Sequence, residues 1–84
     1  MHLYNVLIID DEPYIVHSLS DLLGSQKDLD LNIRTAYSAE EALPIFEKQR
    51  IDILLSDIQM KDMSGIDLIR TVRKRWPTCK SLLI

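Results

Sequence analysis

Two short apolar runs in this 84-residue chain each end directly in acidic residues. Residues 6–9 (VLII) lead into Asp10 and Asp11, and residues 51–56 (IDILLS) lead into Asp57. A short apolar run between polar residues is typical of a buried strand in a parallel sheet. Ligands of such sheets bind outside the carboxyl ends of the strands. We therefore expect Asp10, Asp11 and Asp57 to meet at one edge of a sheet.

Carboxylates gathered in this way repel one another. Two of them about 5 Å apart repel by about 3 kcal/mol at an effective dielectric near 20. A hard divalent cation with oxygen ligands is the simplest reason for such a cluster. The sequence thus predicts a cation site at the sheet edge.

The whole chain alternates strand and helix patterns. Strands are expected at residues 4–9, 31–36, 51–56 and 80–84, and helices from Pro13 to Gly24, after Ser38, and from Ser64 or Gly65 to Trp76. Seven elements in this alternation predict an α/β fold with a parallel sheet and right-handed crossovers.

Local signals mark the helix ends. Pro13 suits a first helical turn, with Asp11 or Glu12 as its cap, and Gly24 is expected to be the C-cap. The second helix opens with a capping box, in which Ser38 caps the helix and Glu41 reaches back.

Pro44 is the one local conflict, because it lies inside the second helix and removes a hydrogen bond. It should kink the helix or cost up to about 3 kcal/mol.

Composition excludes several classes of function. A net charge of −3 and a pI near 5.2 argue against bulk binding to nucleic acid. No run is long and apolar enough to span a membrane, and the N-terminus lacks the features of a signal peptide. A single cysteine, Cys79, cannot form an internal disulfide. These features predict a cytoplasmic location.

Three segments together resemble the receiver domains of bacterial response regulators. They are residues 7–13 (LIIDDEP), residues 56–65 (SDIQMKDMSG), and the pair Trp76-Pro77 followed by Lys80 and an apolar strand. The resemblance covers the whole chain, and its motifs are specific in combination. It implies a flavodoxin-like, doubly wound parallel sheet.

The resemblance also implies a chemistry. Asp57 would accept a phosphoryl group from the phosphohistidine of a sensor histidine kinase. Mg²⁺ would be bound by Asp11, by Asp10 directly or through water, by Asp57, and by the backbone carbonyl of Gln59. Such a module assists its own phosphotransfer but is not otherwise an enzyme.

The chain departs from the family pattern in two places. Lys61 stands where the family usually has proline, which makes the loop after Asp57 less stiff. The chain also stops in the fourth strand, so residues 1–84 are expected to be the N-terminal part of a receiver, lacking its last strand and two helices. We expect self-association through the exposed edge at residues 82–84, and no phosphorylation-driven switch.

Other functions stay open at this point. One is a Mg²⁺-dependent phosphohydrolase with an aspartyl-phosphate intermediate, although such enzymes place a second aspartate where this chain has Gln59. Another is a passive receiver-derived fragment that only binds a partner. A nucleotide- or flavin-binding protein is disfavoured, because no glycine-rich loop follows the first strand. Residues 56–60 and the Trp-Pro pair look most like regulators with an AraC-type helix-turn-helix output domain.

The remaining polar and reactive side chains are expected to be structural. They are Glu12 as a helix-start charge, His17 as a solvated or partner-facing side chain, Met60 and Met63 as loop packing, Arg70, Arg73, Lys74 and Arg75 as a solvated basic run, and Cys79 as a partly buried thiol.

Overall fold

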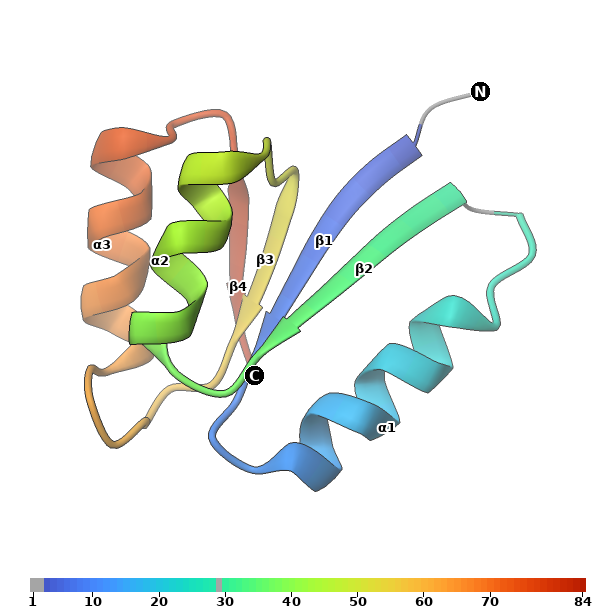
Figure 1. The fold of residues 1–84 in the computed structure, drawn as a ribbon, viewed down its shortest axis with the longest axis horizontal. Helices are drawn as coiled ribbons and strands as arrows, with labels where there is room; N and C mark the ends of the chain where they lie inside the picture. Colours follow the sequence, from blue (N-terminus) through green and yellow to red (C-terminus); the bar gives the residue numbers. More distant parts are fainter. Residues whose placement is uncertain (1–2, 29) are drawn as a thin grey trace.

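A computed structural model describes residues 3–28 and 30–84 of the chain. Strands and helices alternate along it, as predicted (Figure 1). The elements are β1 (Leu3–Ile9), α1 (Pro13–Gly24), β2 (Asp30–Ala36), α2 (Ala39–Lys48), β3 (Ile53–Ser56), α3 (Gly65–Arg75) and β4 (Lys80–Leu83). No helix in the described ranges is long and apolar enough to cross a bilayer.

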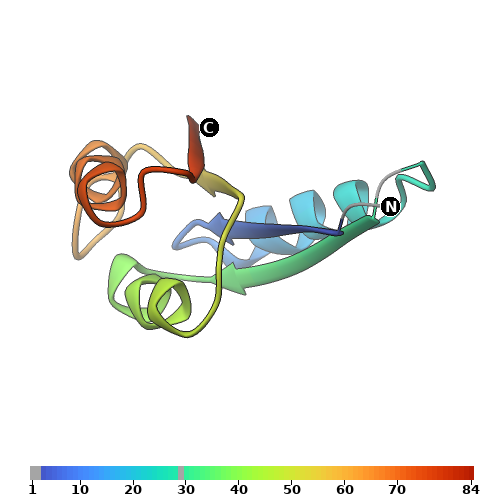
Figure 2. The same cartoon turned by 90° about the horizontal axis from the view of Figure 1, so that it is seen from above.

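The four strands form one parallel sheet in the order β2-β1-β3-β4. The chain winds from β1 outward to β2, then returns past β1 to β3 and β4. This reversal defines a doubly wound sheet of the flavodoxin-like type, so the predicted fold class is confirmed. Figure 2 shows α1 on one side of the sheet and α2 and α3 on the other.

Strand β1 is buried on both faces, which explains its continuous apolar run. Leu7 and Ile9 belong to the larger core cluster, with α2 and α3, whereas Val6 and Ile8 belong to the smaller cluster, with α1. All four side chains are at most 2% exposed. In the edge strand β2, exposed and half-buried residues alternate from Asp30 to Arg34, Thr35 is exposed and Ala36 is buried.

The strand boundaries differ from prediction by one or two residues. β1 and β2 each begin one residue earlier, β3 begins at Ile53 rather than at residue 51, and β4 ends at Leu83 rather than at residue 84. Ile51 is only 3% exposed and packs in the larger core cluster without belonging to the strand. At Ile51 the apolar sequence therefore indicates a buried residue, whereas strand β3 begins only at Ile53.

The ends of α1 correct two predictions. The helix runs through Gly24, and its C-cap is Ser25, whose φ is −82°. No described glycine has a positive φ, so Gly24 does not supply the left-handed turn expected of it. Glu12 occupies the N-cap position, but its side chain makes no capping hydrogen bond.

Helix α2 keeps half of its predicted capping box. The Ser38 hydroxyl accepts a hydrogen bond from the Glu41 N–H at 3.1 Å, as expected. The Glu41 carboxylate accepts from the Tyr37 N–H at 3.3 Å, one residue before the predicted donor. Pro44 lies within the helix, which nevertheless continues to Lys48.

Packing of α2 on α3 and the sheet offsets the bond lost at Pro44. Ala42 is fully buried, and Phe46 stacks on Trp76 with ring centroids 4.9 Å apart. Most helical stability in a folded protein comes from such contacts rather than from local propensity.

Candidate functional site

The acidic residues directly follow β1 and β3, whose carboxyl ends lie side by side in the sheet. Ile9 pairs with Ser56 in the register of β1 and β3, and the next residues are Asp10 and Asp57. The Asp57 N–H donates to the Ile9 carbonyl at 2.9 Å, so the ladder between the two strands continues into the site. Sheet register therefore fixes Asp57 beside Asp10.

Three carboxylates meet at this edge. Asp10, Asp11 and Asp57 each present one carboxylate oxygen, and these oxygens all lie within 4.8 Å of one another. Asp10 is buried, with 6% of its surface exposed, whereas Asp11 and Asp57 are half-buried. The predicted gathering of these three side chains is thus present in the structure.

Asp10 has the most perturbed environment of the cluster. Burial raises the pKa of its carboxyl above the ordinary value, and the charges of Asp57 and Asp11 raise it further. The Glu12 N–H donates to Asp10 Oδ1 at 3.0 Å and opposes this shift in pKa. A buried carboxylate facing two others is what a bound cation would stabilise.

The donor set fits magnesium. The cluster offers only carboxylate oxygens, which are hard ligands of the kind that Mg²⁺ and Ca²⁺ prefer. Two of the three side chains are only half-buried, so bound water can complete a coordination shell. Mg²⁺ characteristically keeps several waters and takes one or two carboxylates.

The loop after Asp57 closes tightly on itself. The Gly65 N–H donates to the Ile58 carbonyl at 2.7 Å. A Cβ at Gly65 would overlap the carbonyl oxygen of Asp57, so only glycine fits there. Ser64 caps α3 by accepting from the Asp67 N–H at 3.1 Å, which agrees with the predicted helix start.

Sequence reasoning missed two residues of this loop. Gly65 was expected as a helix start and as the last residue of the 56–65 motif, but its close approach to the Asp57 carbonyl was not predicted. Asp62 accepts hydrogen bonds from the start of α2, at residues 39 and 40. No local pattern indicates that contact, because its partners lie more than twenty residues earlier in the chain.

The other candidate residues lie around the site or away from it. Gln59 is exposed, two residues after Asp57. Met60 and Met63 pack against the larger core cluster, as expected of loop packing. His17 is exposed and lies 3.1 Å from the Tyr37 hydroxyl, which ties α1 to the loop before α2.

Cys79 is more buried than predicted. Only 6% of it is exposed, and burial raises the pKa of its thiol. The thiol form is inert, so this cysteine fills the core rather than reacting.

The basic run at the end of α3 is a solvated face. Arg73, Lys74 and Arg75 lie in the last helical turn, where positive charge complements the helix C-terminus. Arg75 also pairs with Glu47 at 3.0 Å and lies over the Trp76 ring, 4.4 Å from its centroid. These contacts support the predicted structural role.

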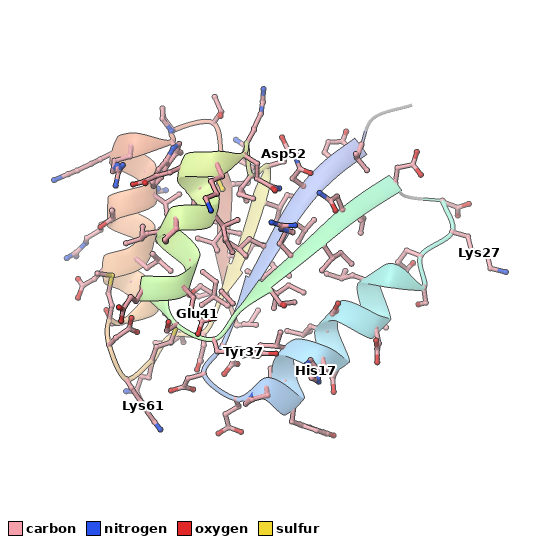
Figure 3. All side chains as sticks on the ribbon, viewed as in Figure 1. His17, Lys27, Tyr37, Glu41, Asp52 and Lys61 are labelled. Carbon is pink, nitrogen blue, oxygen red and sulfur yellow. The ribbon has the colours of Figure 1, made fainter. Side chains whose placement is uncertain are left out.

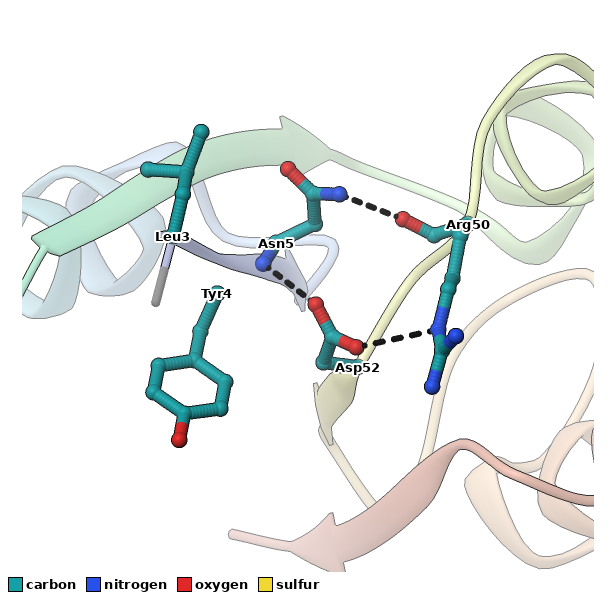
Figure 4. Close-up of a pocket in the computed structure, with 5 residues that line it drawn as sticks. All are labelled: Leu3, Tyr4, Asn5, Arg50 and Asp52. Carbon is teal, nitrogen blue, oxygen red and sulfur yellow. Dashed lines mark hydrogen bonds and ion pairs between the residues drawn. The ribbon is translucent and has the colours of Figure 1, made fainter. Parts of the chain in front are cut away.

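The opposite end of the sheet holds a polar network (Figure 4). The Asp52 carboxylate accepts from the Asn5 N–H at 2.8 Å and pairs with Arg50 at 3.2 Å, and the Asn5 amide donates to the Arg50 carbonyl at 2.8 Å. Figure 3 shows Asp52 at the opposite end of the sheet from Lys61, which lies in the loop after Asp57. Asp52 therefore ties strands together, and it is remote from the acidic cluster.

A doubly wound parallel sheet with an acidic cluster at the carboxyl ends of β1 and β3 defines a narrow class of protein. The family model of the response regulator receiver domain matches residues 6–84. The chain belongs to the response regulator receiver domain family.

Relatives and solved structures agree with this assignment. The chain is 37% identical over 71 residues to the response regulator protein PilR of Pseudomonas aeruginosa, covering 84% of this chain and 15% of PilR. It is 36% identical over 70 residues to the transcriptional regulatory protein YvrH of Bacillus subtilis, covering 83% of this chain and 29% of YvrH. The response regulator TrrA of Thermotoga maritima, solved in complex with Mg²⁺ and beryllium fluoride, matches with a TM-score of 0.86 and 32% identity, over 95% of this chain and 67% of that one. The chain thus spans less than a third of the length of PilR and of YvrH.

Proposed function

We propose that this chain is the phosphoacceptor module of a two-component system and that Asp57 is the residue phosphorylated. The observation that carries this proposal is the convergence of three carboxylates from two strand ends, with their oxygens within 4.8 Å of one another. A cluster of this kind is costly to the fold unless a cation or a reaction uses it.

Accessibility favours Asp57 over Asp10 as the acceptor. Asp10 is buried and one of its oxygens already accepts the Glu12 N–H, whereas Asp57 is half-buried. The Asp57 main chain is held at its N–H by Ile9 and at its carbonyl by the Ser56 hydroxyl, at 3.0 Å. A fixed backbone with a reachable carboxylate is what an in-line attack requires.

The proposed reaction moves one phosphoryl group. A carboxylate oxygen of Asp57 attacks the phosphorus of a phosphohistidine on a sensor histidine kinase. The P–N bond breaks and an acyl phosphate forms on Asp57. The electron pair of that bond stays on the imidazole nitrogen, which takes up a proton from water. Mg²⁺, held by Asp10, Asp11, Asp57 and the Gln59 backbone carbonyl, would neutralise the negative charge that collects among these oxygens.

Incubation with acetyl phosphate and Mg²⁺ tests the proposal. Intact-protein mass spectrometry should show one added phosphoryl group per chain, and EDTA should abolish the addition. Failure of the wild-type chain to gain mass, with Mg²⁺ present, would contradict the proposal. Release of phosphate over many turnovers would instead favour a phosphohydrolase.

We also infer the wider setting of the module. YvrH is a transcriptional regulatory protein by name, which supports a transcriptional output, with an AraC-type helix-turn-helix domain as the form that the sequence resemblance suggests. We place the module in the cytoplasm, as residues 1–84 of a receiver domain, with DNA bound by another part of the protein. We also propose self-association through the β4 side of the sheet, where Leu82 is 56% exposed.

A further inference from the structure

Backbone hydrogen bonds hold both ends of the loop between β3 and α3, residues 57–64. Its first residue, Asp57, is bonded to β1 through the Ile9 carbonyl at 2.9 Å. Its two ends are joined by the bond from Gly65 N–H to the Ile58 carbonyl at 2.7 Å. These bonds fix where the loop leaves the sheet and where it enters α3. Met60 and Met63 pack against the larger core cluster, and the exposed tip, Lys61 and Asp62, lies between them.

Asp62 restrains the tip from a different element. Its Oδ2 accepts from the Glu40 N–H at 2.9 Å, and its Oδ1 accepts from the Ala39 N–H at 3.4 Å. One carboxylate thus receives two successive backbone N–H groups at the start of α2. A charged acceptor at a helix N-terminus is favoured by the helix dipole.

The contact completes the cap of α2. The first four N–H groups of a helix have no partner within it. In α2, the Glu41 N–H donates to the Ser38 hydroxyl and the Ala42 N–H donates to the Ser38 carbonyl, both at 3.1 Å. Ser38 therefore caps locally, and Asp62 supplies the two acceptors that the local sequence lacks.

Lys61 makes this restraint important for the loop. A lysine leaves the backbone φ free, whereas a proline would fix it. Residues 57–64 belong to no helix or strand, and Lys61 and Asp62 at the tip are both exposed. The Asp62 contact thus joins the exposed tip directly to α2.

We propose that Asp62 is a positioning residue for the acceptor site, acting through the loop that carries Gln59. This inference rests on the proposed function, because it concerns the site at which Asp57 is phosphorylated. The Gln59 carbonyl is the Mg²⁺ ligand that we propose on this loop, and binding of the tip to α2 would restrict its position. With the tip released, the loop samples other conformations and Mg²⁺ binds more weakly.

Three variants of the full chain separate this role from general helix stability. Asp62→Ala removes both acceptors from the loop, and Asp62→Asn keeps one oxygen. Ser38→Ala removes a cap from the same helix without touching the loop. Hydrogen exchange measured by NMR should speed up at the Ala39 and Glu40 amides in Asp62→Ala. In Ser38→Ala the increase should centre on the Glu41 amide.

Magnesium titration, followed by NMR, then tests positioning. Asp62→Ala should raise the Kd for Mg²⁺ about tenfold, the lower end of the loss seen when a group supporting metal ligands is removed. Asp62→Asn should recover part of that loss, and Ser38→Ala should stay within about twofold of wild type.

The outcomes are distinguishable. A wild-type chain that binds no Mg²⁺ would contradict the proposed function itself. If the wild type binds Mg²⁺ and Asp62→Ala binds it equally well, only the role of Asp62 is overturned. Equal weakening in Asp62→Ala and Ser38→Ala would also overturn that role, since the effect would then come from α2 as a whole.

Discussion

The carboxylate of Asp10 is buried and lies beside the carboxylates of Asp11 and Asp57. Because burial raises its pKa, its ionised form costs the native state free energy near pH 7. Asp10→Asn should therefore increase the free energy of unfolding by on the order of 1 kcal/mol in EDTA near pH 7. Asparagine keeps an oxygen for the Glu12 N–H, so the change isolates the charge.

The pH dependence gives the sign of this effect. The folded-state pKa of Asp10 lies above its unfolded value, so the wild-type chain loses stability as pH rises through the folded pKa. The advantage of Asp10→Asn should shrink as the pH falls through this raised folded-state pKa, because Asp10 then takes up its proton. Urea unfolding at neutral and acidic pH measures the free energy of unfolding of wild type and of Asp10→Asn. The exposed Asp21→Asn is the control, and its free energy of unfolding should differ from that of wild type by less than about 0.5 kcal/mol. A less stable Asp10→Asn near pH 7 would refute this account of the cluster.

The sequence predicts residues of the site only where strand ends mark them. Asp10, Asp11 and Asp57 each follow a buried apolar run, and parallel sheets align such ends. Asp62 follows no such run, and its partners come from an element placed beside it only by tertiary packing. Its role could not be read from the sequence for that reason.

At the scale of elements, the two glycines of the chain behave oppositely. Gly65→Ala should destabilise the chain by about 1–3 kcal/mol, because the new Cβ would overlap the Asp57 carbonyl and approach Leu83 Cδ2 to 3.0 Å. Gly24→Ala should stabilise it by up to about 1 kcal/mol, because α1 gains helix propensity and the Cβ meets Ile33 only at 4.0 Å. Thermal unfolding of both variants measures the contrast. A Gly65→Ala variant as stable as wild type would contradict the close approach.

The types of the elements were predictable because the spacing of apolar residues differs between strands and helices. Their ends were not, because burial and hydrogen bonding stop at different residues, as Ile51 and Gly24 show. Pro44 was a conflict at the local level, and packing of Phe46 against Trp76 overrides it.

At the scale of the molecule, one side of the sheet is only partly covered. An apolar hollow of about 230 Å³ beside α1 is lined by Val6, Leu23, Leu31, Ile53, Leu55 and Leu82. Val6 and Ile8 of β1 are buried against α1. The uncovered apolar surface belongs to β3 and β4, where Ile53 and Leu55 are half-buried and Leu82 is exposed.

Exposed apolar surface beside an unpaired edge strand favours association. We expect the chain to form dimers or larger species, and Leu82→Lys to shift it toward the monomer. Light scattering coupled to size-exclusion chromatography measures this. A wild-type monomer at all concentrations, with strongly protected amides at residues 82–84, would show that the surface is not used.

We propose that Asp57 is the acceptor carboxylate of the acidic cluster, and matched variants at the two ends of β3 test this assignment. Asp57→Asn and Asp52→Asn each remove one charge, but Asp52 lies in the polar network at the far end of the sheet. After incubation with acetyl phosphate and Mg²⁺, mass spectrometry should find one phosphoryl group on wild type and on Asp52→Asn, and none on Asp57→Asn. Phosphorylation that persists in Asp57→Asn would contradict the claim.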